Sequence, residues 1–111
     1  MISGIYFVEF KANNNEYGNG LAVVDNGKVN GGDHSYLYRG RLDIYGEELR
    51  AALDISHYRG ELDSVMGPLK NYTLNLTGKM AGEGFDVSGG IPNVPNVNIR
   101  IVGRKVAELF K

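Results

Sequence analysis

The sequence predicts an all-β fold, namely an antiparallel up-and-down barrel of about eight strands with at most one short helix. Apolar and polar residues alternate with a period of two along most of the chain, as in strands that bury one face. Glycine occurs 16 times in 111 residues, about twice its usual share of roughly 7%, which indicates frequent turns. A barrel is favoured over an open sheet because closure leaves no exposed edge strand.

The first half of the chain contains four of the expected strand segments. Residues 4–11 alternate cleanly, and residues 18–25 form the next apolar run. The Asn26-Gly27 pair that follows is the strongest short signal for a hairpin, since both residues tolerate the positive φ of a type I′ turn. A strand then starts at Lys28, breaks at the glycines before Asp33, and resumes over residues 34–43.

Tyr45-Gly46 is expected to form the next turn, and the strand over residues 48–58 follows it. Residues 59–70 lose the alternation, so we expect a loop with at most one helical turn around residues 63–66.

The second half of the chain continues the strand pattern. Residues 71–79 restore the alternation, and a short strand containing Phe85 and Val87 lies between glycines. Residues 89–96 contain two prolines and are expected to be a turn-rich connection before a strand over residues 97–101. Residues 103–111 fit either a closing strand or a short helix.

Composition limits the classes of function. Twelve basic residues against 13 acidic ones give a formal net charge of −1, which argues against a nucleic-acid-coating surface or a polybasic membrane patch. The absence of cysteine excludes disulfides, cysteine–zinc sites and thiol nucleophiles. The length fits a single domain over residues 1–111. The chain starts without a signal-peptide pattern and has no apolar run of about 18 residues, so we expect a cytoplasmic protein without a membrane span.

No catalytic or metal-binding motif is present, so we expect no enzyme, cofactor or metal site. The two histidines do not change this expectation. His34 follows Asp33 directly, but the spacing of these residues matches no standard ligand pattern. His57 is separated from Asp54 by the alternation, which puts them on opposite faces of a regular strand. We expect His57 to be buried, with its ring nitrogens bonded to tyrosine hydroxyls or to the backbone.

The expected inner face of the barrel is rich in aromatic residues. These side chains fill a solid core or line an apolar pocket for a small ligand, and we favour the solid core. Candidate ligand-binding residues on this face are Tyr6, Phe10, Tyr36, Tyr38, Leu53, His57, Tyr72 and Phe85. On the outer face, Ile5, Phe7 and Leu37 form an apolar patch that is typical of a partner or dimer surface, unless the C-terminal segment covers it or the register differs.

Several short motifs resemble the GrlR family of negative regulators of type III secretion, mainly in the first half of the chain. They are Gly4-Ile5-Tyr6, the strand start at residues 18–20, Asn26-Gly27, Gly31-Gly32-Asp33, Tyr36-x-Tyr38-x-Gly40 and the strand through His57-Tyr58. The resemblance implies a lipocalin-like barrel that acts by binding. It also implies a cytoplasmic homodimer that binds a transcriptional activator and has room for a lipid-like molecule in its barrel.

In the best understood member of that family, a loop of four consecutive acidic residues engages the activator. The corresponding turn here is residues 43–48, in which an aromatic residue and a glycine separate the acidic residues. An exposed aromatic residue can anchor an interface, and carboxylates steer a basic partner. The candidate partner-binding residues are Asp43, Tyr45, Glu47 and Glu48; an ordinary charged turn is the alternative.

Overall fold

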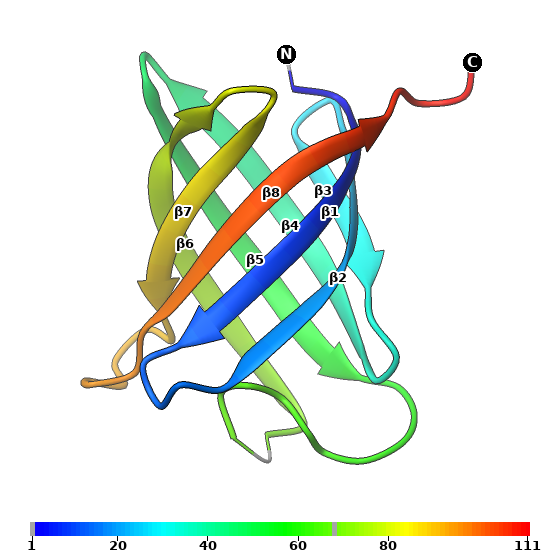
Figure 1. Cartoon of the computed structure of the whole chain (residues 1–111). Coiled ribbons are helices and arrows are strands. Elements are labelled where there is room, and N and C mark those ends of the chain that lie inside the picture. Colours follow the sequence, from blue (N-terminus) through cyan, green and yellow to red (C-terminus); the bar gives the residue numbers. More distant parts are fainter. Residues whose placement is uncertain (1, 68) are drawn as a thin grey trace.

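Eight antiparallel strands form a closed barrel in the computed structural model, which describes residues 2–67 and 69–111 (Figure 1). Each strand pairs with the next along the chain, and β8 pairs with β1 to close the ring. The predicted fold class is therefore confirmed, and the described residues contain no helix. The strands are β1 (Gly4–Ala12), β2 (Tyr17–Asp25), β3 (Lys28–Gly32), β4 (Tyr36–Tyr45), β5 (Glu48–His57), β6 (Asn71–Ala81), β7 (Gly84–Gly90) and β8 (Ile99–Ala107).

The two ends of the barrel differ in their connections (Figure 1). At one end, the hairpin end, pairs of residues join β2 to β3, β4 to β5 and β6 to β7. Both chain termini also lie at this end. The other end, the loop end, holds the longer connections, of which residues 58–70 between β5 and β6 are the longest.

Local backbone geometry explains the short hairpins. Asn26 and Gly27 have φ values of 52° and 78°, which confirms the turn with two positive φ angles that the sequence predicts. In the β4–β5 hairpin only the first central residue, Gly46, has a positive φ, of 65°, as in a type II′ turn. The central pair is Gly46 and Glu47, so Tyr45 is the last residue of β4 and not a turn residue.

Two strands, β4 and β8, begin later than the sequence predicts. β4 begins at Tyr36 rather than at residue 34, because the Asp33 carboxylate accepts hydrogen bonds from the amides of Ser35 and Tyr36 and holds a turn there. Residues 63–66 lie in the predicted loop and form no helical turn, which agrees with the expectation of at most one; Ser64 pairs with Gly67 in an isolated antiparallel bridge.

The C-terminal segment, for which the sequence allows strand or helix, continues as strand to Ala107. It pairs with β1 from Ala12 back to Ile5, with one bulge beside Tyr6. The last strand starts at Ile99, later than the predicted residue 97.

The inward faces of the strands form one hydrophobic core. Tyr6, Leu49 and Phe85 fill the hairpin end, where the Tyr6 and Phe85 rings lie 5.2 Å apart between centroids. At the loop end the β5–β6 loop folds over the barrel and buries Val65. Asn14 in the β1–β2 turn donates a hydrogen bond to the Val65 carbonyl at 3.2 Å. The interior is therefore packed at one end and covered by a loop at the other.

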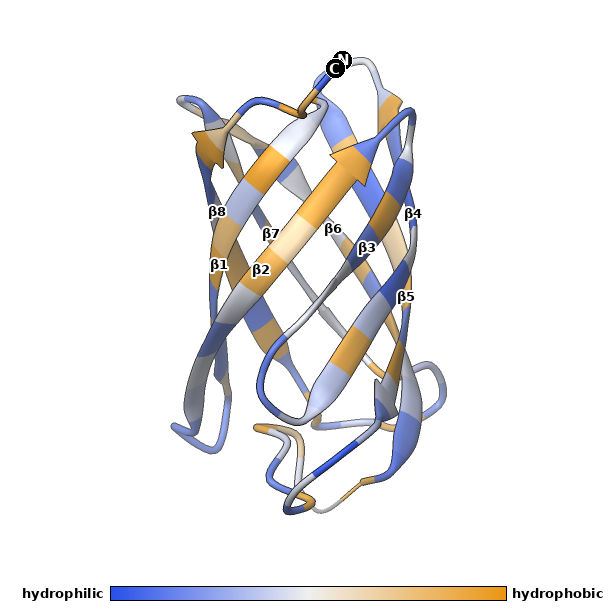
Figure 2. Ribbon diagram, turned by 90° about the vertical axis from the view of Figure 1, so that its right-hand side faces the viewer, coloured by the Kyte–Doolittle hydropathy of each residue, from blue (hydrophilic) through white to orange (hydrophobic). Residues whose placement is uncertain are grey.

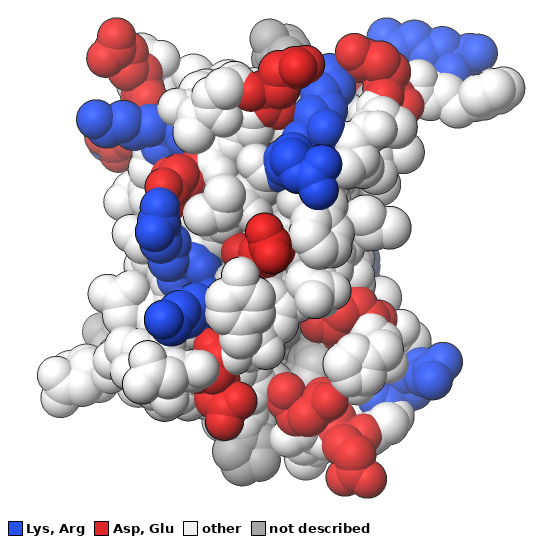
Figure 3. Space-filling view, viewed as in Figure 1, with Lys and Arg blue, Asp and Glu red and all other residues white. Residues whose placement is uncertain are grey.

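The outer surface carries mixed charge. Lysine, arginine and acidic side chains are interspersed over the face shown in Figure 3, in agreement with the net charge of −1. The described residues contain no long apolar helix of the kind that crosses a membrane.

Candidate functional site

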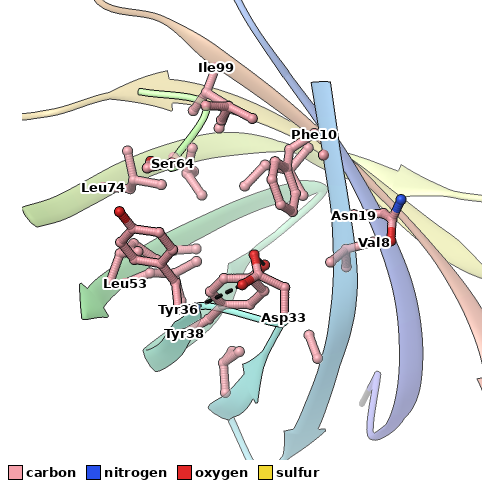
Figure 4. A pocket seen from close by; sticks show the side chains of 18 of the residues that line it. Val8, Phe10, Asn19, Asp33, Tyr36, Tyr38, Leu53, Ser64, Leu74 and Ile99 are labelled. Carbon is pink, nitrogen blue, oxygen red and sulfur yellow. Dashed lines mark hydrogen bonds between the residues drawn. The ribbon is translucent and has the colours of Figure 1, made fainter. Parts of the chain in front are cut away.

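The barrel encloses a cavity of about 200 Å³ (Figure 4). The solid core favoured from the sequence is therefore not what the structure shows. Six of the eight residues predicted to bind a ligand line this cavity. They are Phe10, Tyr36, Tyr38, Leu53, Tyr72 and Phe85. These large side chains, five of them aromatic, surround the space without filling it, because small side chains such as Ala22 and Ala51 also line the inner wall.

Tyr6 and His57, the other two predicted ligand residues, do not line the cavity. The Tyr6 hydroxyl turns to the N-terminal segment and donates to the Ile2 carbonyl at 2.6 Å, while its ring packs on Phe85. His57 is the last residue of β5, where its Nε2 atom lies 2.9 Å from the carbonyl oxygen of Gly60. Its backbone partner agrees with the prediction, although its side chain is only partly buried.

The cavity opens toward the loop end. Its exposed lining residues there are Tyr17, Asn19, His34 and Asp63, whereas the residues on the opposite wall are buried. β3 spans only five residues and pairs with β2 from Leu21 onward, so residues 17–20 of β2 have no partner on β3. This local gap in the sheet, together with the surrounding loops, forms the mouth of the cavity.

A hydrogen bond spans the mouth between two connections. His34 follows β3, and its Nε2 atom lies 2.8 Å from Oδ2 of Asp63 in the β5–β6 loop. This hydrogen bond lowers the pKa of Asp63, which therefore carries a negative charge at neutral pH. The pair ties the two loops together at a solvent-exposed position.

Hydroxyl groups that face the interior are bonded within the protein. Tyr38 donates to the Asp33 carboxylate, and Tyr36 donates to the Leu69 carbonyl at 2.7 Å. The Tyr72 hydroxyl lies 2.5 Å from Oγ of Ser64. Figure 4 shows the Asp33 side chain reaching into the cavity beside Phe10 and Tyr38. The wall is thus apolar in its depth and polar near the mouth.

Burial keeps these tyrosines protonated. It raises the pKa of Tyr72 to about 12, and burial together with the hydrogen bond to Asp33 raises the pKa of Tyr38 further. A protonated hydroxyl can donate to a carboxylate, so Tyr38 serves as a fixed donor to Asp33 at neutral pH.

The free energy of unfolding is expected to fall as the pH rises from 10 to about 12. Tyr72 ionises near 10 in the unfolded chain but only near 12 in the folded one, so alkali favours unfolding. Urea unfolding at a series of pH values measures this loss, which we expect to reach about 2 kcal/mol for Tyr72. Tyr72→Phe should flatten the curve, whereas Tyr17→Phe, at an exposed position, should not. Identical curves for Tyr72→Phe and the wild type would contradict this account.

The predicted partner-binding residues cluster at the β4–β5 hairpin. Tyr45 is 56% exposed and lies at the hairpin end, with the Arg50 guanidinium 4.6 Å from its ring centroid. Glu48 accepts from Nε of Arg50 at 2.8 Å. These three side chains form an exposed aromatic and charged cluster next to the turn.

Arginines from the same hairpin partly offset the acidic charge. Asp43 lies inside β4, opposite Arg50, and its Oδ1 atom is 4.0 Å from Nη2 of Arg41. Glu47 occupies the turn and forms no salt bridge within residues 2–67 and 69–111. The tip of the hairpin is therefore not purely acidic, because Glu47 lies between Asp43 and Glu48, and both of these carboxylates have an arginine within salt-bridge distance.

An apolar surface lies on the outside of β1 and β2 and reaches β4. Ile5 and Phe7 are opposite Val23 and Leu21 in the register, and Leu37 lies across Gly32 from Leu21. Figure 2 looks onto these strands and shows hydrophobic residues concentrated along β2 and β1. We call these five apolar residues the outer apolar face. Ile5, Phe7 and Leu37 point outward as predicted, although Ile5 and Phe7 are only partly exposed. The Arg104 guanidinium of the neighbouring strand β8 lies over the Phe7 ring, 5.8 Å from its centroid.

The described residues contain no cluster of three or more histidine or acidic side chains arranged to hold a metal ion. Asp54 bonds outside the barrel to Thr73 at 3.2 Å, on the opposite face of β5 from His57, as the alternation predicts.

Comparison with models of known protein families identifies the family of this chain. Residues 1–109 match the family model described as the T3SS negative regulator GrlR, where T3SS stands for the type III secretion system. The chain belongs to the GrlR family. The match covers all eight strands of the barrel, whereas the motif resemblance is concentrated in the first half of the chain. No curated protein matches this GrlR-family chain.

Sequence reasoning missed two residues that shape the site of this GrlR-family barrel. In the sequence, Asp33 appears beside His34 and within the motif Gly31-Gly32-Asp33, and neither context predicts its position in the cavity. The available signal is that of a turn, because an aspartate often accepts hydrogen bonds from the amides two and three residues after it. Ser64 carries no comparable signal, because its contact with Tyr72 depends on how the β5–β6 loop folds over the barrel.

Proposed function

We propose that this GrlR-family protein represses type III secretion by binding a protein partner in the cytoplasm, without catalysing a reaction. The family match over residues 1–109 is the observation that carries the proposal, since the family is described as a negative regulator. By resemblance, the partner is a transcriptional activator. A binding role also agrees with an exterior that offers two distinct surfaces, the β4–β5 hairpin and the outer apolar face.

The β4–β5 hairpin is the proposed contact for the activator. Tyr45 supplies an exposed ring at the tip, and aromatic residues are frequent anchors of interfaces. Glu47 and Glu48 add negative charge that attracts a basic partner. Asp43, further along β4, extends the acidic edge of the same hairpin.

Removing the hairpin contacts is expected to relieve repression. The variant combines Tyr45→Ala, Glu47→Ala and Glu48→Ala, which together delete the exposed ring and two charges without touching the buried face. Expressed in the source bacterium, the wild type should lower the transcript levels of secretion genes. The triple variant should copurify with at least tenfold less activator and should no longer lower these transcript levels.

A matched control changes another hairpin at the same end. Met80→Ala with Glu83→Ala removes one exposed apolar side chain and one charge from the β6–β7 hairpin. This double variant should repress like the wild type. Full repression by the triple variant would exclude the β4–β5 hairpin as the contact site.

A second candidate function is the binding of a small apolar molecule inside the barrel. The cavity of about 200 Å³ favours it, because buried apolar space lined by aromatic rings with a few polar groups at one end is typical of small-molecule sites. Phe10, Tyr36, Tyr38 and Leu53 are among the proposed ligand contacts.

We further propose that the protein is a homodimer that buries the outer apolar face. Leu21 is 51% exposed and borders Phe7 and Leu37, so an apolar surface across three strands faces solvent in the single chain. Such contiguous apolar patches commonly mark interfaces. Phe110 is fully exposed and does not cover this face.

A further inference from the structure

We propose that the cavity selects a small organic ammonium, whose apolar group fills the barrel and whose charged nitrogen lies against Asp33 at the mouth. The inference rests on the second proposed function, small-molecule binding, and specifies the chemical class of the ligand. It follows from the size of the cavity, from the sign of the charges at its mouth and from the aromatic rings beside Asp33.

The size of the cavity limits the ligand. Its volume of about 200 Å³ exceeds the roughly 150 Å³ of an engineered apolar cavity in another protein that holds benzene. It is smaller than the pockets of roughly 300–1,000 Å³ that hold drug-sized molecules. The interior therefore accepts one ring or a short chain, on the order of ten non-hydrogen atoms. A two-chain lipid does not fit within this volume.

The charges at the mouth are negative. Asp33 and Asp63 both line the cavity near its opening, where His34 Nε2 lies 2.8 Å from Asp63, and the described lining residues include no lysine or arginine. A ligand with a carboxylate or phosphate group at this position would face two carboxylates, which disfavours it by like-charge repulsion. A cation at the same position is attracted by both.

Asp33 is held in place as an acceptor. Its Oδ1 atom accepts from the amides of Ser35 and Tyr36, each at 2.8 Å, and its Oδ2 atom accepts from the Tyr38 hydroxyl. A carboxylate offers about four acceptor positions, so one remains for a ligand donor. The other inward hydroxyls, on Tyr36 and Tyr72, are engaged with Leu69 and Ser64.

Aromatic rings complete the surroundings of the charged nitrogen. The rings of Phe10 and Tyr38 meet edge to face with centroids 6.0 Å apart, and Figure 4 shows Asp33 beside both. An ammonium group within about 6 Å of a ring centroid gains a cation–π attraction that a neutral alcohol does not. Carboxylate and rings together therefore distinguish an amine from an alcohol of equal size.

The order of the groups also distinguishes a free amine from a lysine side chain of a protein. The apolar wall lies deep and the carboxylates lie at the mouth, so the ligand enters with its apolar group first. A lysine side chain would enter with its ammonium first and would place the charge against the apolar wall, away from Asp33.

The test compares three ligands of similar shape by isothermal titration calorimetry at neutral pH. They are 2-phenylethylamine, 2-phenylethanol and phenylacetate. We expect the amine to bind at least tenfold more tightly than the alcohol, and phenylacetate to bind most weakly. Asp33→Asn should bring the amine to the affinity of the alcohol, while alcohol binding stays within about threefold of the wild type. The amide oxygen introduced by this substitution can still accept the two backbone hydrogen bonds, and retained alcohol binding reports that the variant is folded.

Asp54→Asn is the matched control, because Asp54 faces outward on β5 and bonds to Thr73. It should preserve the preference for the amine. Equal affinity of the wild type for amine and alcohol, or an amine preference that persists in Asp33→Asn, would overturn the ammonium inference and leave small-molecule binding in place. Failure of all three ligands to bind the wild type would overturn both proposals.

Discussion

Leu53→Trp is expected to abolish ligand binding in the barrel and to lower the affinity for 2-phenylethylamine and 2-phenylethanol at least a hundredfold. Leu53 is buried on β5 and lines the cavity between its register partners Gly40 and Leu74. An indole at this position extends into the space that a ligand would occupy. Isothermal titration calorimetry measures the loss, and native mass spectrometry of freshly purified protein shows whether a copurified molecule disappears with it.

Two checks separate blocked binding from damage to the fold. Extra volume in a packed interior typically costs about 1–3 kcal/mol, so urea unfolding should show Leu53→Trp weakened but still cooperative. Val102→Trp adds the same ring on the outer surface of β8, outside the cavity lining and the outer apolar face, and should bind like the wild type. A folded Leu53→Trp that binds both ligands normally would exclude the cavity as the binding site.

Gly40 is less suitable than Leu53 for filling the cavity, although it also faces inward. A Cβ atom at Gly40 would lie 2.0 Å from the Ala52 carbonyl oxygen and 2.9 Å from Leu53 Cα. The neighbouring strand approaches so closely that any side chain at this position would push the sheet apart. A Gly40→Leu variant would therefore test the stability of the barrel and not the occupancy of its cavity.

Leu21→Glu is expected to convert the proposed homodimer into a monomer, with at least a hundredfold increase in the dissociation constant. Leu21 is at the centre of the outer apolar face, next to Phe7 on β1, and a carboxylate there would be buried without a partner on association. A hundredfold change corresponds to about 2.7 kcal/mol, which is within the range of single interface hot spots. Sedimentation velocity over a range of protein concentrations measures the effect.

The control for dimerisation places the same change elsewhere. Leu62→Glu alters an apolar side chain of similar exposure in the β5–β6 loop, away from the outer apolar face, and should leave the dimer intact. A wild type that sediments as a monomer at every concentration would refute the homodimer. If Leu21→Glu remained a dimer, the interface would have to lie on a surface other than the outer apolar face.

The barrel could be predicted from the sequence because its signals are local. The alternation within each strand fixes which residues point inward, and Asn26-Gly27 fixes the register of one hairpin. The C-terminal strand was harder to predict. Its inward residues Ile101 and Gly103 show alternation, but the bulge opposite Tyr6 interrupts the pattern near residue 106.

The site was less predictable, because it depends on contacts between distant parts of the chain. Whether Phe10 and Tyr38 fill the interior or border a cavity depends on how eight strands close, and no spacing in the sequence records this. The hairpin tip shows a similar limit. Its acidic residues are visible in the sequence, as are the arginines two residues away on the same strands, Arg41 near Asp43 and Arg50 near Glu48; only the position of Arg50 opposite Asp43 follows from the pairing of β4 with β5.

The difference between the two ends of the barrel has a consequence for regulation. The β4–β5 hairpin is at one pole, and the mouth between Tyr17, His34 and Asp63 is at the other. If the two proposed sites are both used, an activator at the first pole would not obstruct a small molecule entering at the second, and a ternary complex would assemble in either order. Any influence of the small molecule on the activator would then pass through the strands themselves and not through competition for space.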